Sequence, residues 1–216
     1  MNCYEKDEMV NAYAAGQFDS DKQVRITEAV KMIESVKGNI GNVLDVGCGV
    51  GNMLRLLRGA GIKANYDGCD DSEKMIFKAR MLQRRETANF DLGSLPTLAY
   101  KDGSRDMVMC LATMTYTPEP LKGIAELFRI SRRYVLLDMI FAPGEKCETR
   151  YHPLYGEPQA VELQAKADAM RVIEECGGGE LSGITVTYKT GMSGFKDLEL
   201  QGIMGIQGFQ VLWEKA

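Results

Sequence analysis

A glycine-rich loop that follows a short apolar run constrains the fold of this chain more than any other feature. The segment NVLDVGCGVGNMLRLL, residues 42–57, carries Gly47, Gly49 and Gly51 between a strand-like run and a stretch with helical spacing. Glycine lets a backbone approach a ligand closely, and the free amides at the start of a helix attract an anionic group. The segment therefore predicts a strand, a ligand-binding loop and a helix.

The rest of the chain predicts that this strand–helix unit is repeated. Apolar runs predict further strands at 64–70, 87–92, 105–112, 133–140, 183–189 and 208–216. Helical spacing, N-caps and breakers predict helices at 22–37, 52–61, 72–85, 120–132 and 158–179, with a long loop at 141–157. This alternation predicts an α/β fold, in which seven strands form an open, mostly parallel sheet with helices on both faces. Ligands of such sheets bind beyond the carboxyl ends of the strands.

The spacing of the glycines separates two classes of ligand. Both a pyrophosphate and a carboxylate would suit the loop, but the dinucleotide fingerprint G-x-G-x-x-G needs a glycine where this chain has Asn52. Asp45, inside the preceding strand, would also disfavour a pyrophosphate and favour a ligand ammonium group. A nicotinamide-dependent oxidoreductase is therefore disfavoured.

Four motifs in order resemble those of the class I S-adenosylmethionine-dependent methyltransferases of the small-molecule type, close to methyltransferase domains 11 and 25. They are VLDVGCGVG, GCDDSEKM after the second strand, FDLGSLP after the third and DGSRDMV before the fourth, and together they cover residues 40–138. The resemblance implies a Rossmann-like sheet with an antiparallel last strand, and S-adenosylmethionine as cofactor. One domain, 1–216, is expected, with a helical segment, 1–38, covering the cofactor site and a substrate-side loop, 141–157.

The resemblance also implies roles for individual residues. Asp45 would face the ammonium group of the cofactor, the loop amides its carboxylate, and Asp70 its ribose hydroxyls. Asp91 would face the adenine amine, with Leu92 alongside. Asp71 occupies the position at which the family usually has an apolar residue that packs on adenine. The cofactor-binding residues expected from the motifs are Asp45, Gly47, Cys48, Gly49, Gly51, Asp70, Asp71, Met75, Asp91, Leu92, Leu111 and Tyr13.

Candidate catalytic residues lie where the fourth and fifth strands end. Tyr116 follows the fourth strand, the fifth ends at Asp138, and His152, the only histidine, lies in the loop beyond. The chain lacks both the [ND]-P-P-[YF] motif of amino-group methylation on nucleobases and glutamine and the Pro-Cys nucleophile of cytosine C5 methylation. We therefore expect a small molecule to be methylated at O, N or C by in-line displacement, without a metal. Methylation of a protein or RNA, and a non-catalytic domain that binds S-adenosylmethionine, remain alternatives.

Composition limits the partners. The net charge is −4 and no block of basic residues stands out, so no nucleic-acid partner is expected. No signal peptide is expected, because the first residues are charged, and no membrane span is expected, because the longest apolar run is too short to cross a bilayer. Six scattered cysteines without a C-x-x-C pair favour reduced thiols over zinc or disulfides. A cytoplasmic monomer or homodimer with a small-molecule substrate is expected.

Overall fold

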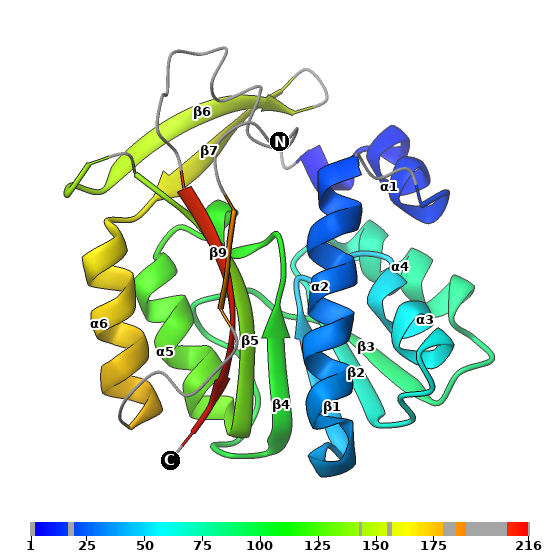
Figure 1. Cartoon of the computed structure of the whole chain (residues 1–216). Coiled ribbons are helices and arrows are strands. Elements are labelled where there is room, and N and C mark those ends of the chain that lie inside the picture. Colours follow the sequence, from blue (N-terminus) through cyan, green and yellow to red (C-terminus); the bar gives the residue numbers. More distant parts are fainter. Residues whose placement is uncertain are drawn as a thin grey trace.

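The computed structural model describes residues 3–16, 20–142, 144–154, 157–178, 185–188 and 207–215, and the described residues form a seven-stranded sheet between two layers of helices (Figure 1). The strand order is β3-β2-β1-β4-β5-β9-β8. The strands are β1 Asn42–Val46, β2 Asn65–Asp70, β3 Ala88–Leu92, β4 Arg105–Cys110, β5 Ser131–Phe141, β8 Thr185–Tyr188 and β9 Gln207–Glu214. Strands β1 to β5 pair in parallel, and β9 pairs antiparallel with both β5 and β8. The predicted Rossmann-like sheet with an antiparallel last strand is confirmed.

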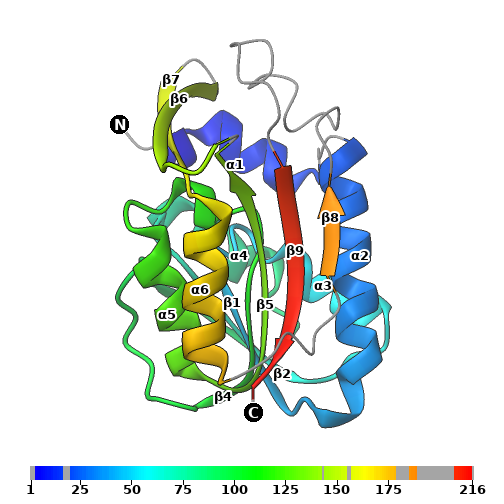
Figure 2. The same cartoon turned by 60° about the vertical axis from the view of Figure 1, so that its left-hand side comes forward.

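The helices lie on both faces of the sheet. Helices α5 and α6 cover one face and α2, α3 and α4 the other, as the two views in Figures 1 and 2 show. The helices are η1 Cys3–Glu5, α1 Asp7–Ala14, α2 Ser20–Val36, η2 Lys37–Asn39, α3 Asn52–Gly59, α4 Glu73–Leu82, η3 Met114–Tyr116, α5 Pro120–Ile130 and α6 Lys166–Gly177. None of these described helices combines the length and the apolar character that a bilayer crossing requires.

Strand β5 illustrates how the sequence divides the core between the two faces. Val135 and Leu137 are buried against α5 and α6, whereas the alternating residues Tyr134 and Leu136 are buried in the core beneath α2 and α3. Successive side chains of a strand point to opposite faces, so a strand covered on both sides must be apolar at nearly every position. The continuous apolar run that predicted this strand has that cause.

The cap of α4 was predicted correctly. The Ser72 hydroxyl accepts a hydrogen bond from the amide of Met75 at 3.1 Å, which satisfies one of the donors that a helix start leaves unpaired. Helix α4 begins directly after this residue, at the carboxyl end of β2. The cap therefore fixes the chain direction next to Asp70.

The predicted loop at 141–157 and the predicted start of a helix at residue 158 are both wrong. Residues 148–154 form strand β6 (Glu148–Leu154), which pairs antiparallel with β7 (Glu157–Leu163), and α6 begins only at Lys166. The segment after Pro158 is rich in helix formers, but pairing with β6 overrides that preference. The hairpin lies beyond the carboxyl ends of the parallel strands, above the sheet in Figure 1.

Candidate active site

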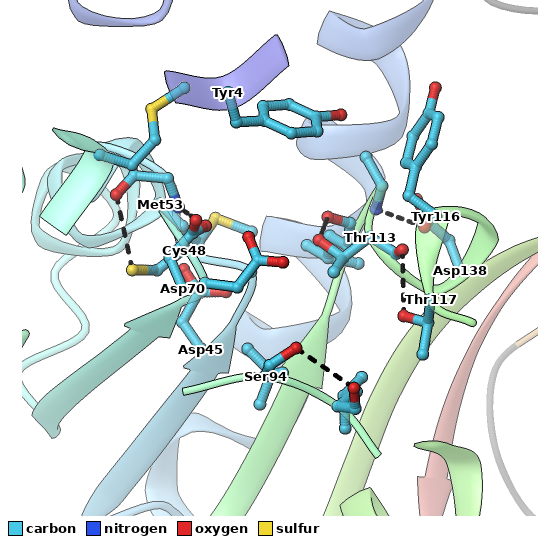
Figure 3. A pocket seen from close by; sticks show the side chains of 18 of the residues that line it. Tyr4, Asp45, Cys48, Met53, Asp70, Ser94, Thr113, Tyr116, Thr117 and Asp138 are labelled. Carbon is cyan, nitrogen blue, oxygen red and sulfur yellow. Dashed lines mark hydrogen bonds between the residues drawn. The ribbon is translucent and has the colours of Figure 1, made fainter. Parts of the chain in front are cut away.

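A cavity of about 460 Å³ opens at the carboxyl ends of the parallel strands (Figure 3). Its floor comes from β1, β2, β4, β5 and β9 and the turns after them, and its roof from η1, α1 and β7. Ten of the predicted site residues line it: Asp45, Gly47, Cys48, Gly49, Asp70, Asp71, Met75, Leu111, Tyr13 and Tyr116. The structure thus brings together residues that are spread over more than a hundred positions of the chain.

Two residues predicted to bind adenine are not among the described residues that line this cavity. Asp91 points away and pairs with Arg80 at 3.3 Å, while Leu92 is 55% exposed. The chain reaches the cavity only beyond the end of β3, where the Gly93 amide donates a hydrogen bond to the Asp70 carbonyl. Gly93 and Ser94 therefore line the cavity wall. The described lining here consists of the residues two positions further along the chain, and the assignment of Asp91 and Leu92 to the adenine site stays a prediction.

Two further predicted site residues, Gly51 and His152, are not among the described residues that line the cavity. Gly51 is the N-cap of α3, where a Cβ would come within 2.9 Å of the Phe90 ring, so this glycine serves helix packing. His152 lies in β6, and its side chain is outside the part of the structure that is described. Its catalytic role stays a prediction.

The amides of the glycine loop are already hydrogen-bonded within the protein. Those of Gly47 and Cys48 both donate to the Cys69 carbonyl, that of Gly49 donates to the Asp70 carboxylate, and that of Gly51 donates to the Cys48 carbonyl. These four amides therefore have partners within the protein, and their role in binding a ligand carboxylate stays a prediction. The loop is instead a rigid wall, tied to the end of β2.

Gly47 is required by a close approach between two loops. Its φ is +76°, and a Cβ at this position would lie 2.0 Å from Thr113 Oγ1 in the turn after β4. The Thr113 hydroxyl in turn donates to the Leu111 carbonyl at 3.2 Å. This contact between the two loops of the cavity wall therefore requires a residue without a side chain at position 47.

Gly47→Ala is expected to destabilise the protein by about 1–3 kcal/mol, because it adds both a clash and a strained backbone conformation. Gly59→Ala is the matched control, since a Cβ at that position of α3 meets nothing within 4 Å and alanine favours a helix. Urea unfolding of both variants measures the difference. Equal free energies of unfolding would contradict the close approach.

Asp70 is the last residue of β2 and lines the cavity. Its carboxylate accepts hydrogen bonds from the amides of Gly49 at 2.8 Å and Ser72 at 3.1 Å. Burial raises its pKa to about 6, although these two hydrogen bonds act in the opposite direction. The carboxylate is thus fixed in direction by two chain segments and faces the cavity.

Asp45 lies deeper, on the adjacent strand β1, and is 4% exposed. The buried Tyr66 hydroxyl donates a hydrogen bond to its carboxylate. Burial raises the pKa of Asp45 to about 7; the Tyr66 hydrogen bond lowers it, and the negative charge of Asp70 raises it further. An ionised Asp45 in this place attracts a cationic group.

Two tyrosines of the roof, from η1 and α1, lie next to Tyr116 of the η3 turn. The Tyr4 ring makes edge-on contacts with Tyr13, at 6.4 Å between ring centroids, and with Tyr116, at 6.2 Å. Side chains beside the cavity hold this segment in place: the Asn52 amide donates to the Tyr13 carbonyl at 2.9 Å, and the Ser72 hydroxyl to the Tyr4 carbonyl at 2.9 Å. Asn52, which stands where the dinucleotide fingerprint has its third glycine, therefore helps to hold the roof in place.

The side of the cavity over β5 and β9 contains polar residues that the sequence analysis largely missed. Asp138 is 5% exposed, and its carboxylate accepts a hydrogen bond at 2.6 Å from the amide of Ala112, whose φ is +55°. Its register partner is the fully buried Gln210 on β9. The available signal was a polar residue inside an otherwise apolar strand. The other lining residues that were not predicted are Ile26, Val46, Met53, Leu56, Gly93, Ser94, Leu95, Ala112, Thr113, Thr117, Pro118 and Ala160.

The cysteines add no reactive group to the site. Burial raises the pKa of the Cys48 thiol well above its usual range, so it is a neutral part of the wall. The cysteines whose side chains are described, 48, 69, 110, 147 and 176, are free thiols. Over the described residues no group of three or more histidines, cysteines or acids is placed to hold a metal ion.

Comparison with known proteins agrees with this geometry. A family model described as a methyltransferase domain matches residues 44–136. The chain is 35% identical over 86 residues to trans-aconitate 2-methyltransferase of Variovorax paradoxus, which covers 40% of this chain and 32% of that protein. It is 32% identical over 95 residues to norajmaline N-methyltransferase of Rauvolfia serpentina, covering 42% and 32%. The matched segments thus span about a third of each relative.

The fold has solved counterparts over nearly the whole chain. The magnesium protoporphyrin IX methyltransferase of Synechocystis PCC 6803, solved with bound S-adenosylmethionine, superposes with a TM-score of 0.59 at 22% identity, over 99% of this chain and 85% of that one. Its likeness concerns the fold, and the family model supplies the match in sequence. Residues 44–136 thus match the methyltransferase domain family, and the chain shares the fold of this solved S-adenosylmethionine-bound methyltransferase.

Proposed function

We propose that this protein transfers a methyl group from S-adenosylmethionine to O, N or C of a small molecule, by in-line displacement and without a metal. The observation that carries the proposal is the extent of the cavity. It runs from Asp70 on β2, past Asp45 on β1, to Asp138 on β5, and so offers room for a nucleoside at one side and an acceptor at the other. Its volume of about 460 Å³ lies within the range of small-molecule sites, roughly 300–1,000 Å³.

The chemistry of the lining fits this cofactor. The Asp70 carboxylate would accept hydrogen bonds from the ribose diol, and Asp45 would face the ammonium group. Met75 and Leu111 supply apolar wall on the same side. The solved methyltransferase from Synechocystis that shares this fold binds S-adenosylmethionine, which supports the same ligand here.

The protein's part in the reaction is to bind, orient and exclude water. S-adenosylmethionine supplies a methyl group on a sulfonium. The rigid glycine loop and the turn after β4, locked together at Gly47 and Thr113, would fix the cofactor side of the cavity. The tyrosine roof would limit the access of water. Holding two reactants in near-attack geometry can account for roughly 7–11 kcal/mol of the barrier.

The names of the curated relatives leave the acceptor open. One acts on trans-aconitate, a polycarboxylate, and the other methylates a nitrogen of norajmaline. The family-model match covers residues 44–136 and so ends before the hairpin and β9, and the matches to these two relatives span only 86 and 95 residues. The acceptor must therefore be argued from the cavity itself.

Ligand-induced stabilisation tests the cofactor. At a hundred times its dissociation constant, S-adenosylhomocysteine should stabilise the fold by about 2.7 kcal/mol, which corresponds to a rise in Tm of about 5–10 °C for a chain of this size. NAD should cause no shift, because Asn52 occupies the position of the third fingerprint glycine. Differential scanning calorimetry with both ligands measures this. A shift with NAD and none with S-adenosylhomocysteine would refute the proposal.

A further inference from the structure

Helix α4 carries apolar side chains on two sides, and the fold requires only one of them. Met75, Ile76 and Ala79 are buried, as expected of a helix that covers one face of a sheet. Phe77 and Met81, one helical turn apart, are 67% and 51% exposed. A helix at the surface of a soluble protein usually presents polar side chains on its outer side. The burial of α4 therefore does not explain this exposed pair.

Most of the large apolar side chains that the described part of the chain exposes lie at this place. They are Phe77, Met81 and Leu82 on α4, Leu92 at the end of β3, and Tyr151 on the hairpin. Strand β3 lies beside α4, where the Arg80 guanidinium donates a hydrogen bond to the Phe90 carbonyl at 2.8 Å. Single apolar residues are normal on a protein surface, whereas a group of them marks an interaction site.

Basic side chains surround this group. Lys78, Arg84 and Arg85 line the same surface depression as Phe77, Met81 and Leu82, and we call these six residues the α4 surface. The other cations of α4 are paired, Lys74 with Asp7 and Arg80 with Asp91, whereas none of the described acidic side chains pairs with the three cations of the α4 surface. On a chain with a net charge of −4, this local excess of positive charge beside apolar side chains favours a partner that is negatively charged and partly apolar.

The shape of the α4 surface separates the possible partners. Its six residues belong to one helix and the turn that follows it, and no second element of the described chain forms an opposite wall. A groove that holds a partner helix needs such a wall, whereas a membrane surface does not. Two copies of the α4 surface facing each other would bring their cations together, which disfavours a symmetric dimer. Protruding apolar side chains with lysine and arginine beside them are typical of helices that lie on membranes.

We infer that the α4 surface binds reversibly to the surface of a membrane that contains anionic lipids. Phe77, Met81 and Leu82 would enter the boundary between head groups and acyl chains, and the three cations would contact the lipid head groups. The inference does not depend on the methyl transfer proposed above, because none of the six residues lines the cavity. It concerns attachment to a membrane surface and not a crossing of the bilayer.

Co-sedimentation with vesicles tests the inference. The full chain is mixed at neutral pH with vesicles of phosphatidylcholine alone, or with vesicles in which about a third of the lipid is phosphatidylglycerol. We expect the protein to sediment with the anionic vesicles and to stay in solution with the neutral ones, because cations near an anionic surface supply much of the attraction. Absence of sedimentation with the anionic vesicles, or equal sedimentation with both, would overturn the inference.

The triple variant Lys78→Gln/Arg84→Gln/Arg85→Gln tests the cations. We expect its affinity for the anionic vesicles to fall about a hundredfold, because each cation near the membrane surface contributes roughly fivefold. The control removes three exposed cations from α5 and α6, which cover the opposite face of the sheet (Figures 1 and 2). Its substitutions are Lys122→Gln, Lys166→Gln and Arg171→Gln. The control has the same net charge and should keep the affinity of the unchanged protein within about threefold. An equal loss in both variants would assign the binding to overall charge and overturn the inference.

The double variant Phe77→Ser/Met81→Ser tests the apolar contact. We expect its affinity for the anionic vesicles to fall at least about tenfold, since two apolar side chains no longer leave water. Both side chains are exposed in the free protein, so its Tm and its affinity for S-adenosylhomocysteine should stay unchanged. Sedimentation velocity without vesicles should give the same coefficient for the variant and the unchanged chain. A dimer of the unchanged chain that the variant dissociates would assign the α4 surface to a second copy and overturn the inference.

Discussion

Asp70→Ala is expected to weaken the binding of S-adenosylhomocysteine by about a hundredfold or more. The carboxylate is fixed by the amides of Gly49 and Ser72 and would accept two hydrogen bonds from the ribose diol. A hydrogen bond to a charged group is worth about 1.5–3 kcal/mol, so the loss of two corresponds to at least about two powers of ten in affinity. Isothermal titration calorimetry at pH 7.5 measures the dissociation constant.

The matched control for this variant is Asp91→Ala. The family resemblance predicts that Asp91 contacts adenine, whereas the structure places it outside the cavity and in contact with Arg80. Its replacement should leave the affinity within twofold of that of the unchanged protein. An Asp70 variant that binds as tightly as the control would show that this carboxylate does not contact the ribose. A weakened Asp91 variant would restore the prediction made from the motif.

Sequence reasoning predicted the fold because the decisive signals are local. Apolar runs such as residues 133–140 identify strands that are covered on both faces, and Ser72 identifies the start of a helix. Three glycines with left-handed backbone conformations mark the turn between β1 and α3. The hairpin of β6 and β7 was missed because its stability comes from pairing between two segments, and neither segment alone carries a strand pattern.

The place of Asp45 and Asp70 in the cavity could be predicted for the same reason. Asp45 and Asp70 each lie within a strand or at its last residue, so the direction of the side chain follows from the pleat. Asp91 also lies near the end of a strand, but β3 is an edge strand and the chain turns into the cavity only at Gly93. Which residue faces the cavity there depends on a hydrogen bond to the Asp70 carbonyl, which no local pattern encodes.

The acceptor side was the least predictable part. Asp138 and Gln210 are opposite each other only because β9 pairs antiparallel with β5, although they are 72 positions apart along the chain. Each is a polar residue in an apolar run, which marks it as unusual but does not say what it faces. Their common place in the cavity is a consequence of tertiary structure alone.

The affinity for the cofactor should depend strongly on pH through Asp45. Burial raises its pKa to about 7 in the ligand-free protein, so at pH 5 the carboxyl is protonated and cannot hold an ammonium group. Between pH 5 and pH 7.5 its ionisation should increase the affinity for S-adenosylhomocysteine on the order of fifty- to a hundredfold.

The stability of the ligand-free protein should change in the opposite direction. The raised pKa of Asp45 contributes to the free energy of unfolding below about pH 4, and this contribution is lost as the pH rises through 7. Calorimetric titrations and ligand-free melting curves over this range measure the two trends.

Tyr66→Phe separates Asp45 from the other acidic groups that titrate nearby. The Tyr66 hydroxyl stabilises the ionised form of Asp45, whereas the charge of Asp70 opposes it, and the neighbouring thiols stay neutral because burial raises their pKa values. Without the hydroxyl, the midpoint of the affinity profile should move up by about 1–2 pH units, since one unit corresponds to about 1.4 kcal/mol.

Tyr134→Phe is the control for this shift. Tyr134 is buried in the same core, but its hydroxyl lies within 3.3 Å of Glu214 at the opposite end of the sheet. Both variants lose one phenol hydroxyl, so their free energies of unfolding should fall to a similar extent, while only Tyr66→Phe should move the midpoint. If the two profiles coincide, the pH dependence originates elsewhere, and Asp45 does not bind the ammonium group in its ionised form.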